Sequence, residues 1–302
     1  MPAEPPIPAD SWTLVVLAAG LGTRFGGRKQ LEPVGPSGQI LSDYALRDAH
    51  HAGAGASVFV IAPDDEGAYQ AHHHDRPAGV PIAFAHQRMD RLPPGHSPPD
   101  GRVKPWGTAH ALLTALPLVS GSCVVVNADD FYGPTAFRSA HGFLRSTPPD
   151  RPAMALVGYR LADTTSPSGP VSRAVVLQGP DGIVEELIEV TEISACETGF
   201  TGVGNEVRLS FTGREIVSMN CWVLNAAIFP LLEEAFQRFL ERGHDLVTSE
   251  FRLPDALNEV THHEDVPIHV LPGGGGWMGL THPGDRDEVR AALLEEERVP
   301  CS

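Results

Sequence analysis

Residues 12–30 read WTLVVLAAGLGTRFGGRKQ, a short apolar run followed by a loop rich in glycine and basic residues. The run from Trp12 to Ala19 is typical of a parallel strand that is covered on both faces of its sheet. The loop glycines let the backbone approach a ligand and turn its amides inward. Arg24, Arg28 and Lys29 add positive charge beside them. The stretch predicts a phosphate-binding loop at the end of a buried strand, with a purely structural turn as the alternative.

The rest of the first half alternates between short apolar runs and helical patterns. Further strands are predicted at 57–62, 80–85 and 123–127, and helices at 40–52 and 108–116, with Thr108 as the N-cap of the second helix. This order is typical of βαβ units, so we expect an α/β fold with a doubly wound, mostly parallel sheet of the Rossmann-like type. In such sheets, ligands bind at the carboxyl ends of the strands.

The second half has a different pattern, with hairpin-like signals between its apolar runs. Strands are predicted at 153–160, 174–177, 183–191 and 217–224, and helices at 226–242 and 285–297. We interpret this half as a smaller β-rich extension on the same core and not as an independent domain. The predicted organisation is a flexible tail at 1–11 and a single domain at 12–302, made of halves 12–150 and 151–302.

The amino-acid composition argues against several classes of binding partner and of cellular location. The 302 residues contain 22 Lys and Arg against 38 Asp and Glu, which gives a formal net charge of −16. A general nucleic-acid binder needs a basic face, and so does a protein that docks on anionic membranes. The negative net charge therefore argues against both classes. The first residues lack the basic patch and apolar run typical of a signal peptide, and no apolar run reaches membrane length, so we expect a cytoplasmic location.

Cysteine and histidine patterns do not predict a zinc site. The four cysteines are scattered without a C-x-x-C motif, which indicates ordinary thiols in a reducing compartment. Histidines occur as a run at 72–74 and a pair at 262–263. Because no further ligand accompanies them at metal-binding spacing, we interpret them as surface residues.

The motifs LAAGLGTRFGG and RKQLEPVG together resemble the signature of the nucleotidyltransferases that activate sugar phosphates. Four further segments occur in the order expected for that superfamily: KPWGTAHAL (104–112), VVVNADDFYG (124–133), IVEELIEV (183–190) and VSMNCWVLN (217–225). The resemblance covers most of the chain. The lysine follows Arg24 by five residues, and KQLEPVG is similar to the cytidylyltransferases as much as to the hexose-1-phosphate thymidylyltransferases. The identities of the base and of the sugar therefore stay open.

The resemblance implies roles for residues around the glycine-rich loop and the base. Arg24 is expected to stabilise the leaving pyrophosphate, and Lys29 to offset charge at the α-phosphate. The remaining nucleotide-binding residues are expected to be Leu17, Ala19, Gly20, Leu21, Gly22, Thr23, Gln87, Gly107 and Thr108.

The resemblance also implies a metal site and a sugar site. Asp129 follows a buried strand, where a carboxylate reaches the ligand-binding edge and suits Mg²⁺; a turn or helix cap is the alternative. Asp285, in THPGDRDEV, matches the late acidic element of the cytidylyltransferases and is the second candidate metal ligand, with a helix N-cap as the alternative. Glu189 and Asn220 are expected to contact the sugar phosphate. Trp222 is expected either to stack on the sugar or to lie in the core.

The predicted function is that of a Mg²⁺-dependent nucleotidyltransferase that joins a nucleoside triphosphate to a sugar 1-phosphate or a similar phosphate ester. Two alternatives stay open: a glycosyltransferase that consumes a nucleotide sugar, and a non-catalytic nucleotide-sensing homologue. The superfamily often forms dimers or tetramers, which leaves a homo-oligomer open as well.

Overall fold

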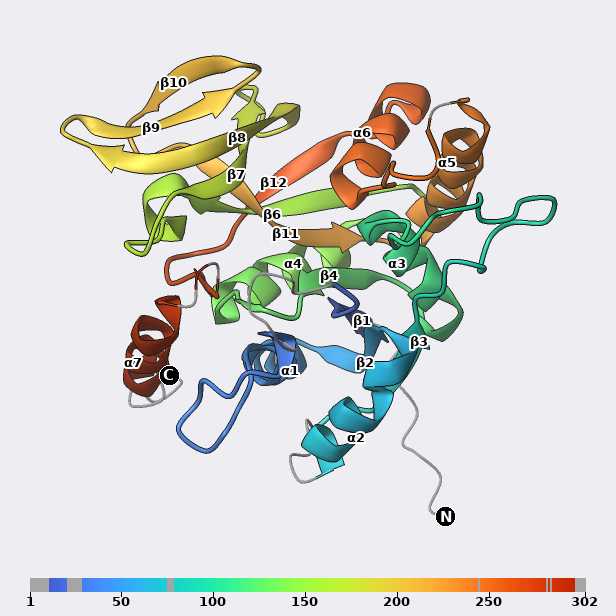
Figure 1. Ribbon diagram of the computed structural model, residues 1–302, viewed down its shortest axis with the longest axis horizontal. Helices are drawn as coiled ribbons and strands as arrows, with labels where there is room; N and C mark the ends of the chain where they lie inside the picture. Colours follow the sequence, from blue (N-terminus) through green and yellow to red (C-terminus); the bar gives the residue numbers. More distant parts are fainter. Residues whose placement is uncertain are drawn as a thin grey trace.

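The computed structural model describes residues 11–20, 29–74, 79–243, 245–280, 282 and 284–296. A mixed sheet of eleven strands runs through the described part of the chain (Figure 1). Its main path has the order β10-β9-β8-β7-β11-β4-β1-β2-β3, while β6 pairs with both β11 and β12. A second, two-stranded sheet joins β13 to β5.

The strands and helices have the following bounds. The strands are β1 (Trp12–Leu17), β2 (Ala54–Ile61), β3 (Ile82–His86), β4 (Cys123–Asn127), β5 (Asp130–Phe131), β6 (Met154–Arg160), β7 (Val171–Gln178), β8 (Val184–Cys196), β9 (Gly199–Gly204), β10 (Val207–Phe211), β11 (Ile216–Leu224), β12 (Ile268–Pro272) and β13 (Met278–Gly279). The α-helices are α1 (Leu41–His51), α2 (Glu66–His74), α3 (Thr108–Ala115), α4 (Pro134–Ser146), α5 (Phe229–Glu241), α6 (Leu253–Glu264) and α7 (Asp285–Glu296).

Strands β1 to β4 of the first half are parallel to one another. β1 pairs in parallel with β2 on one side and with β4 on the other, and β3 continues the run beyond β2. The carboxyl ends of β1 and β4 meet, because Leu17 lies opposite Asn127. These are the strand ends at which open α/β sheets bind ligands. The predicted α/β fold with a mostly parallel central sheet is confirmed.

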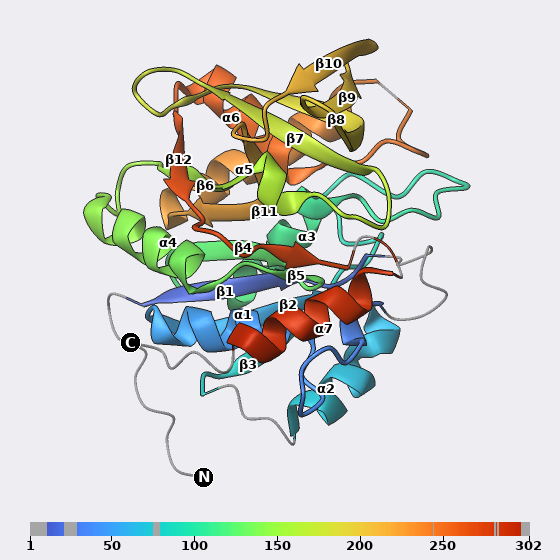
Figure 2. The same ribbon diagram turned by 90° about the vertical axis from the view of Figure 1, so that its left-hand side faces the viewer.

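Helices cover both faces of this sheet, which explains why β1 and β4 are apolar throughout. Leu14 and Val16 belong to one core together with residues of α1 and α4, whereas Val15 belongs to a second core with residues of α3, α5 and α6. Figure 2 shows α1 and α4 on one side of the sheet and α3 and α5 on the other. Successive residues of one strand thus bury their side chains in opposite cores.

The second half enters the sheet through antiparallel strands. β11 pairs antiparallel with β4, and β7 to β10 continue from β11 as a series of antiparallel pairs. In Figure 1 this series forms the upper left of the molecule, next to the parallel strands. α7 packs separately: its Val289 and Leu293 form a small third core with Phe131 of β5 and Tyr44 of α1.

The structure corrects the predicted starts of two helices. Gly107, and not Thr108, is the N-cap of α3, and the Thr108 hydroxyl instead accepts a hydrogen bond from the Leu253 amide of α6 (2.8 Å). The predicted helix at 226–242 begins as a short 3-10 turn, and its α-helix starts only at Phe229. Among the described residues, no helix combines the length and the hydropathy of a membrane span.

Candidate active site

A lysine and an aspartate, both predicted from the sequence as site residues, meet at the carboxyl ends of β1 and β4. The Lys29 Nζ atom lies 2.6 Å from Asp129 Oδ2, although the two residues are 100 positions apart in the chain. Lys29 opens a short 3-10 turn, and Asp129 stands just beyond β4. The side chain of Lys29 is 15% exposed and that of Asp129 27%. Both groups therefore remain accessible to a ligand at this edge.

Asp130 lies beneath this pair and is almost completely buried. Its Oδ2 accepts hydrogen bonds from Asn127 Nδ2 (2.8 Å) and from the Tyr132 hydroxyl (3.1 Å). Burial, and after it the negative charge of Asp129, raise the pKa of Asp130 to about 7. The two adjacent aspartates thus have different environments: Asp129 faces solvent beside a cation, and Asp130 anchors the turn.

Asn220 joins the site from the antiparallel strand β11. Its Nδ2 donates to Asn127 Oδ1 (2.7 Å), and its Oδ1 accepts from the Trp222 indole N–H (2.9 Å). The φ angle of Asn220 is 58°, and the register of β11 against β6 shifts between Ser218 and Trp222. This bulge turns the Asn220 side chain toward the end of β4.

Trp222 is fully buried in the second core. Of the two interpretations of its sequence position, the structure therefore supports a core residue, and we do not retain it as a sugar contact. Its N–H holds the Asn220 amide in one orientation.

Asp285 is the first residue of α7 and is 5% exposed. Its Oδ1 accepts from the Ser166 hydroxyl (2.6 Å), and its Oδ2 accepts from the His282 amide (2.6 Å). Burial alone raises the pKa of this carboxyl, but the hydrogen bonds from Ser166 and His282 outweigh burial and hold it below its ordinary value.

Strand β13 brings the segment before α7 to the first aspartates. Gly279 lies opposite Asp130 in the β13–β5 pair, and the Leu280 amide donates to the carbonyl oxygen of Asp129 (3.4 Å). A Cβ atom at Gly279 would lie 2.6 Å from the Trp277 ring and 2.7 Å from Asp130 Oδ1, so a larger residue there would displace these side chains. The late acidic segment thus packs directly against the turn that carries Asp129.

Arg173 of β7 is a buried cation beside both acidic segments. Its Nε donates to the Thr164 carbonyl (3.1 Å), and its guanidinium carbon lies 5.0 Å from the centre of the Trp277 ring. Burial lowers the pKa of Arg173, while the charges of Asp130, Asp285 and Glu189 act in the opposite direction. Arg173, Trp277, Ser166 and Asp285 line a cavity of about 210 Å³.

The residues predicted for the base meet beside the amino end of α3. Gln87 follows β3, and its Nε2 donates to the Gly107 carbonyl (2.9 Å) and lies 3.3 Å from His110 Nδ1. Gly107 has a φ of 106°, and a Cβ atom there would lie 2.6 Å from the carbonyl oxygen of Phe251. Both the dihedral angle and the close approach require glycine.

The other predicted residues differ in how much the structure describes. Leu17, Ala19 and Gly20 lie at the carboxyl end of β1, where the Gly20 carbonyl accepts from Gln30 Nε2 (3.0 Å). Glu189 lies on β8, exposed, opposite Ala174 of β7. The loop residues Leu21, Gly22, Thr23 and Arg24 lie outside the described residues.

Sequence reasoning missed Asn127 and Arg173. A signal for Arg173 was available, because it shares the inward face of β7 with Val171 and Val175, and a charged residue in that phase of an alternating strand indicates a buried ion. Asn127 ends an apolar strand, and its link to Asn220 on a distant strand had no sequence signal.

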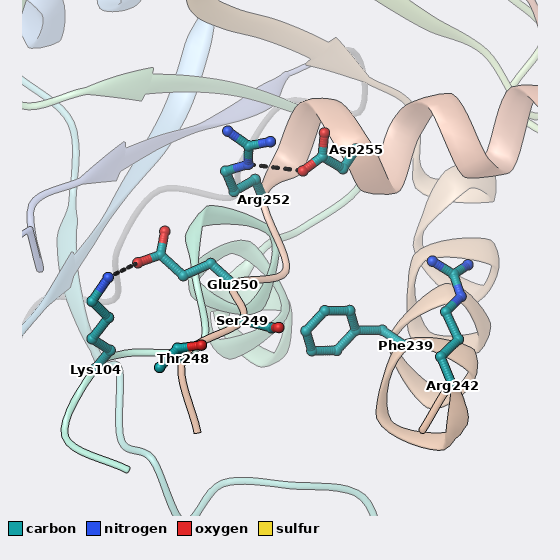
Figure 3. A pocket seen from close by; sticks show the side chains of 8 residues that line it. All are labelled: Lys104, Phe239, Arg242, Thr248, Ser249, Glu250, Arg252 and Asp255. Carbon is teal, nitrogen blue, oxygen red and sulfur yellow. Dashed lines mark hydrogen bonds and ion pairs between the residues drawn. The ribbon is translucent and has the colours of Figure 1, made fainter. Parts of the chain in front are cut away.

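A second groove, larger than the cavity that Asp285 lines, is lined by other residues (Figure 3). It measures about 540 Å³ and is lined by residues from the segments before α3 and α6 and from α5 and α6. Its charges are already paired, Lys104 with Glu250 (3.6 Å) and Arg252 with Asp255 (2.8 Å). None of the predicted site residues lines it.

Comparison with known proteins identifies the amino-terminal part of the chain. Residues 14–97 match the family model of the MobA-like NTP transferase domain. This part of the chain is therefore similar to an NTP transferase domain. The resemblance inferred from the motifs is confirmed, as is the predicted enzyme class of nucleotidyltransferase. The comparison with curated proteins found no match.

Solved structures extend the likeness of fold over nearly the whole chain. The inositol-1-phosphate CTP transferase from T. maritima superposes with a TM-score of 0.64 at 15% identity, covering 97% of this chain and 99% of that one. A UDP-glucose pyrophosphorylase complexed with UDP-glucose gives 0.56 at 15% identity, covering 95% and 99%. HddC from Yersinia pseudotuberculosis gives 0.55 at 14% identity, covering 93% and 98%. At these identities the likeness concerns the fold.

Proposed function

We propose that this nucleotidyltransferase joins a nucleoside triphosphate to a sugar 1-phosphate or a similar phosphate ester and releases pyrophosphate. The observation that carries the proposal is the contact between Lys29 and Asp129 at the carboxyl ends of two parallel strands. The sequence motifs independently predict Lys29 as the cation for the triphosphate and Asp129 as a carboxylate ligand for a metal. The two similar structures whose names state a substrate act on inositol 1-phosphate and UDP-glucose, which supports the choice of acceptor class.

In the proposed reaction, a phosphate oxygen of the acceptor attacks the α-phosphorus of the triphosphate. The bond from that phosphorus to the bridging oxygen breaks, and pyrophosphate leaves with the electron pair. Lys29 offsets the negative charge that grows at the α-phosphate, and Arg24 is proposed to stabilise the leaving pyrophosphate. The amides of Gly20, Leu21, Gly22 and Thr23 hold the triphosphate. Catalysis rests on positioning and charge neutralisation.

The acidic residues fit a magnesium ion by their chemistry. Asp129 offers an accessible carboxylate, and a Mg²⁺ site commonly uses one or two carboxylates together with substrate phosphates. Ser166 and His282 fix the orientation of the Asp285 carboxylate, as neighbours of metal-binding carboxylates do. We therefore propose Asp129 and Asp285 as the residues that hold Mg²⁺. When bound, the ion supplies positive charge for the phosphates.

The second half is proposed to hold the acceptor. Asn220 reaches the end of β4 from β11, and Glu189 lies near Arg173 on the neighbouring strands. Gln87, Gly107 and Thr108, at the ends of β3 and α3, are proposed to hold the base. Because β11 joins β4 and β7 in one sheet, we propose that residues 12–302 work as a single domain.

The test is a pyrophosphate-release screen of the full chain. The common nucleoside triphosphates are crossed with sugar 1-phosphates and with cyclitol and alditol phosphates, in the presence of Mg²⁺. We expect one combination to release pyrophosphate, and Asp129→Asn to abolish most of that release. Asp150→Asn, which neutralises an exposed loop aspartate, is the matched control and should keep full activity. Full activity of Asp129→Asn would contradict the proposed site, and no release in any combination would contradict the proposed function.

A further inference from the structure

A cluster of potential metal ligands lies between α1 and α2, apart from the residues of the proposed active site. It consists of Asp43 in the first turn of α1 and of His72 and His73 in the last turn of α2. One ligand atom from each of these residues lies within 4.8 Å of the other two. The histidine run had no accompanying ligand in the sequence; the fold brings Asp43 to it from 29 positions upstream.

The three ligand atoms are close enough together for one metal ion to reach all of them. His72 Nε2 lies 2.7 Å from Asp43 Oδ2, and His73 Nδ1 lies 3.7 Å from Asp43 Oδ1. Ligand atoms around a tetrahedral Zn²⁺ with ordinary bond lengths lie ~3.3 Å apart, between these two values. The histidines use different ring nitrogens, which allows two adjacent residues to point at one centre. Two imidazoles and one carboxylate are a common protein donor set for zinc.

The three side chains are held in place by their surroundings. Asp43 Oδ2 also accepts a hydrogen bond from the Ile40 amide (2.9 Å), which fixes the carboxylate at the start of α1. The His73 ring packs against Phe59 of β2, with ring centres 5.0 Å apart, and is 6% exposed. Asp43 and His72 are each 13% exposed, so the cluster still borders solvent. A water molecule could complete the coordination from that side.

We propose that Asp43, His72 and His73 bind a zinc ion that joins α1 to α2. Imidazole ligands favour zinc and similar transition metals, whereas Mg²⁺ favours sites made of oxygen alone. The cluster therefore differs in metal preference from the carboxylates proposed for Mg²⁺. The inference is independent of the proposed function, because the cluster shares no residue with that site. The competing interpretation is a set of Asp–His contacts that only tether the two helices, which predicts no zinc uptake.

The experiment measures zinc binding to the chelator-treated full chain by calorimetry, with excess Mg²⁺ present to occupy sites made of oxygen. Co²⁺ replaces Zn²⁺ in a parallel measurement, because its visible absorption reports a tetrahedral site with nitrogen ligands. We expect one equivalent of zinc and a rise in the thermal midpoint, because a ligand that binds only the folded state stabilises it. His72→Gln and Asp43→Asn should each weaken binding by at least about tenfold, the lower range for loss of a supporting residue around a metal.

His74→Gln is the matched control, since it removes the exposed histidine next to the cluster in the same helical turn. It should bind zinc as the wild-type chain does. Circular dichroism of each variant checks the fold, and the two separate ligand variants guard against the loss of one to misfolding. The proposal is overturned if the wild-type chain takes up no zinc, or if His72→Gln and Asp43→Asn bind it as tightly as His74→Gln.

Discussion

Asp129 and Asp285 are the same residue type with the same proposed ligand, yet their surroundings differ. Asp129 stands at the end of a parallel strand, 27% exposed, with an ammonium group 2.6 Å from one oxygen. Asp285 begins a helix, is 5% exposed, and has a hydrogen-bond donor on each oxygen. The comparison indicates that the Asp129 carboxylate can exchange Lys29 for another cation. The Asp285 carboxylate is instead held in one orientation by its two hydrogen bonds.

The largest expected effect concerns the cation next to Asp129. Lys29→Ala should lower turnover at least about 100-fold, because one preorganised charge at the reacting phosphate is removed. Arg145→Ala, which removes an exposed cation in the last turn of α4, should leave turnover unchanged. Steady-state pyrophosphate release measures both variants. Equal rates in the two would show that the Lys29–Asp129 pair is only structural.

A smaller effect is expected at Asp285. Ser166→Ala removes the hydroxyl that orients its carboxylate. If Asp285 binds the metal, the Mg²⁺ concentration for half-maximal activity should rise by about tenfold, while turnover at saturating Mg²⁺ changes little. Ser146→Ala, which removes an exposed hydroxyl with one hydrogen bond on α4, is the control. An unchanged Mg²⁺ requirement together with lower stability would leave Asp285 as a helix cap.

The smallest effect is expected at Asp130, the buried neighbour of Asp129. Its pKa in the folded chain is about 7 against an ordinary value of 3.8, so between these values the folded state keeps a proton that the unfolded chain has released. The contribution of Asp130 to the free energy of unfolding must therefore fall as the pH rises from 3.8 to about 7. Above about pH 7 this contribution stays constant.

Asp130→Asn should remove this contribution, because the amide does not ionise and still offers an oxygen to Asn127 and Tyr132. Urea unfolding at about pH 5 and about pH 8 should show a smaller decrease in stability for the variant than for the wild-type chain. Asp150→Asn should behave as the wild type. A decrease of the same size in Asp130→Asn and wild type would mean that Asp130 ionises normally in the folded chain.

Local patterns predicted the first half of the fold well. The apolar runs of β1, β2 and β4 identify strands because both of their faces are buried, so that burial can be read from consecutive residues. The helices α2, α4 and α6 were missed, as was the extent of the β8–β10 hairpins. β10, with three exposed residues and no fully buried one, carries a weak hydrophobic signal.

The candidate sites likewise contain residues that local motifs predicted and residues that they did not. Motifs singled out Lys29, Asp129 and Gln87, each of which stands next to a recognisable strand or loop. They did not reveal Arg173, Asn127 or the cluster of Asp43 with His72 and His73, whose partners come from other elements. Such contacts depend on sheet order and helix packing, which consecutive residues do not encode locally.

The sequence alone thus determined the residue types available for phosphate chemistry and the parallel strands that carry them. It could do so because the apolar runs of buried strands and the glycine and basic residues of a loop can be read from consecutive positions of the chain. The tertiary structure decided the rest: that Lys29 meets Asp129 across 100 positions, that Trp222 lies in the core, and that Asp43 joins two histidines. These outcomes follow from side chains of distant segments packing together, and only the folded chain fixes those distances.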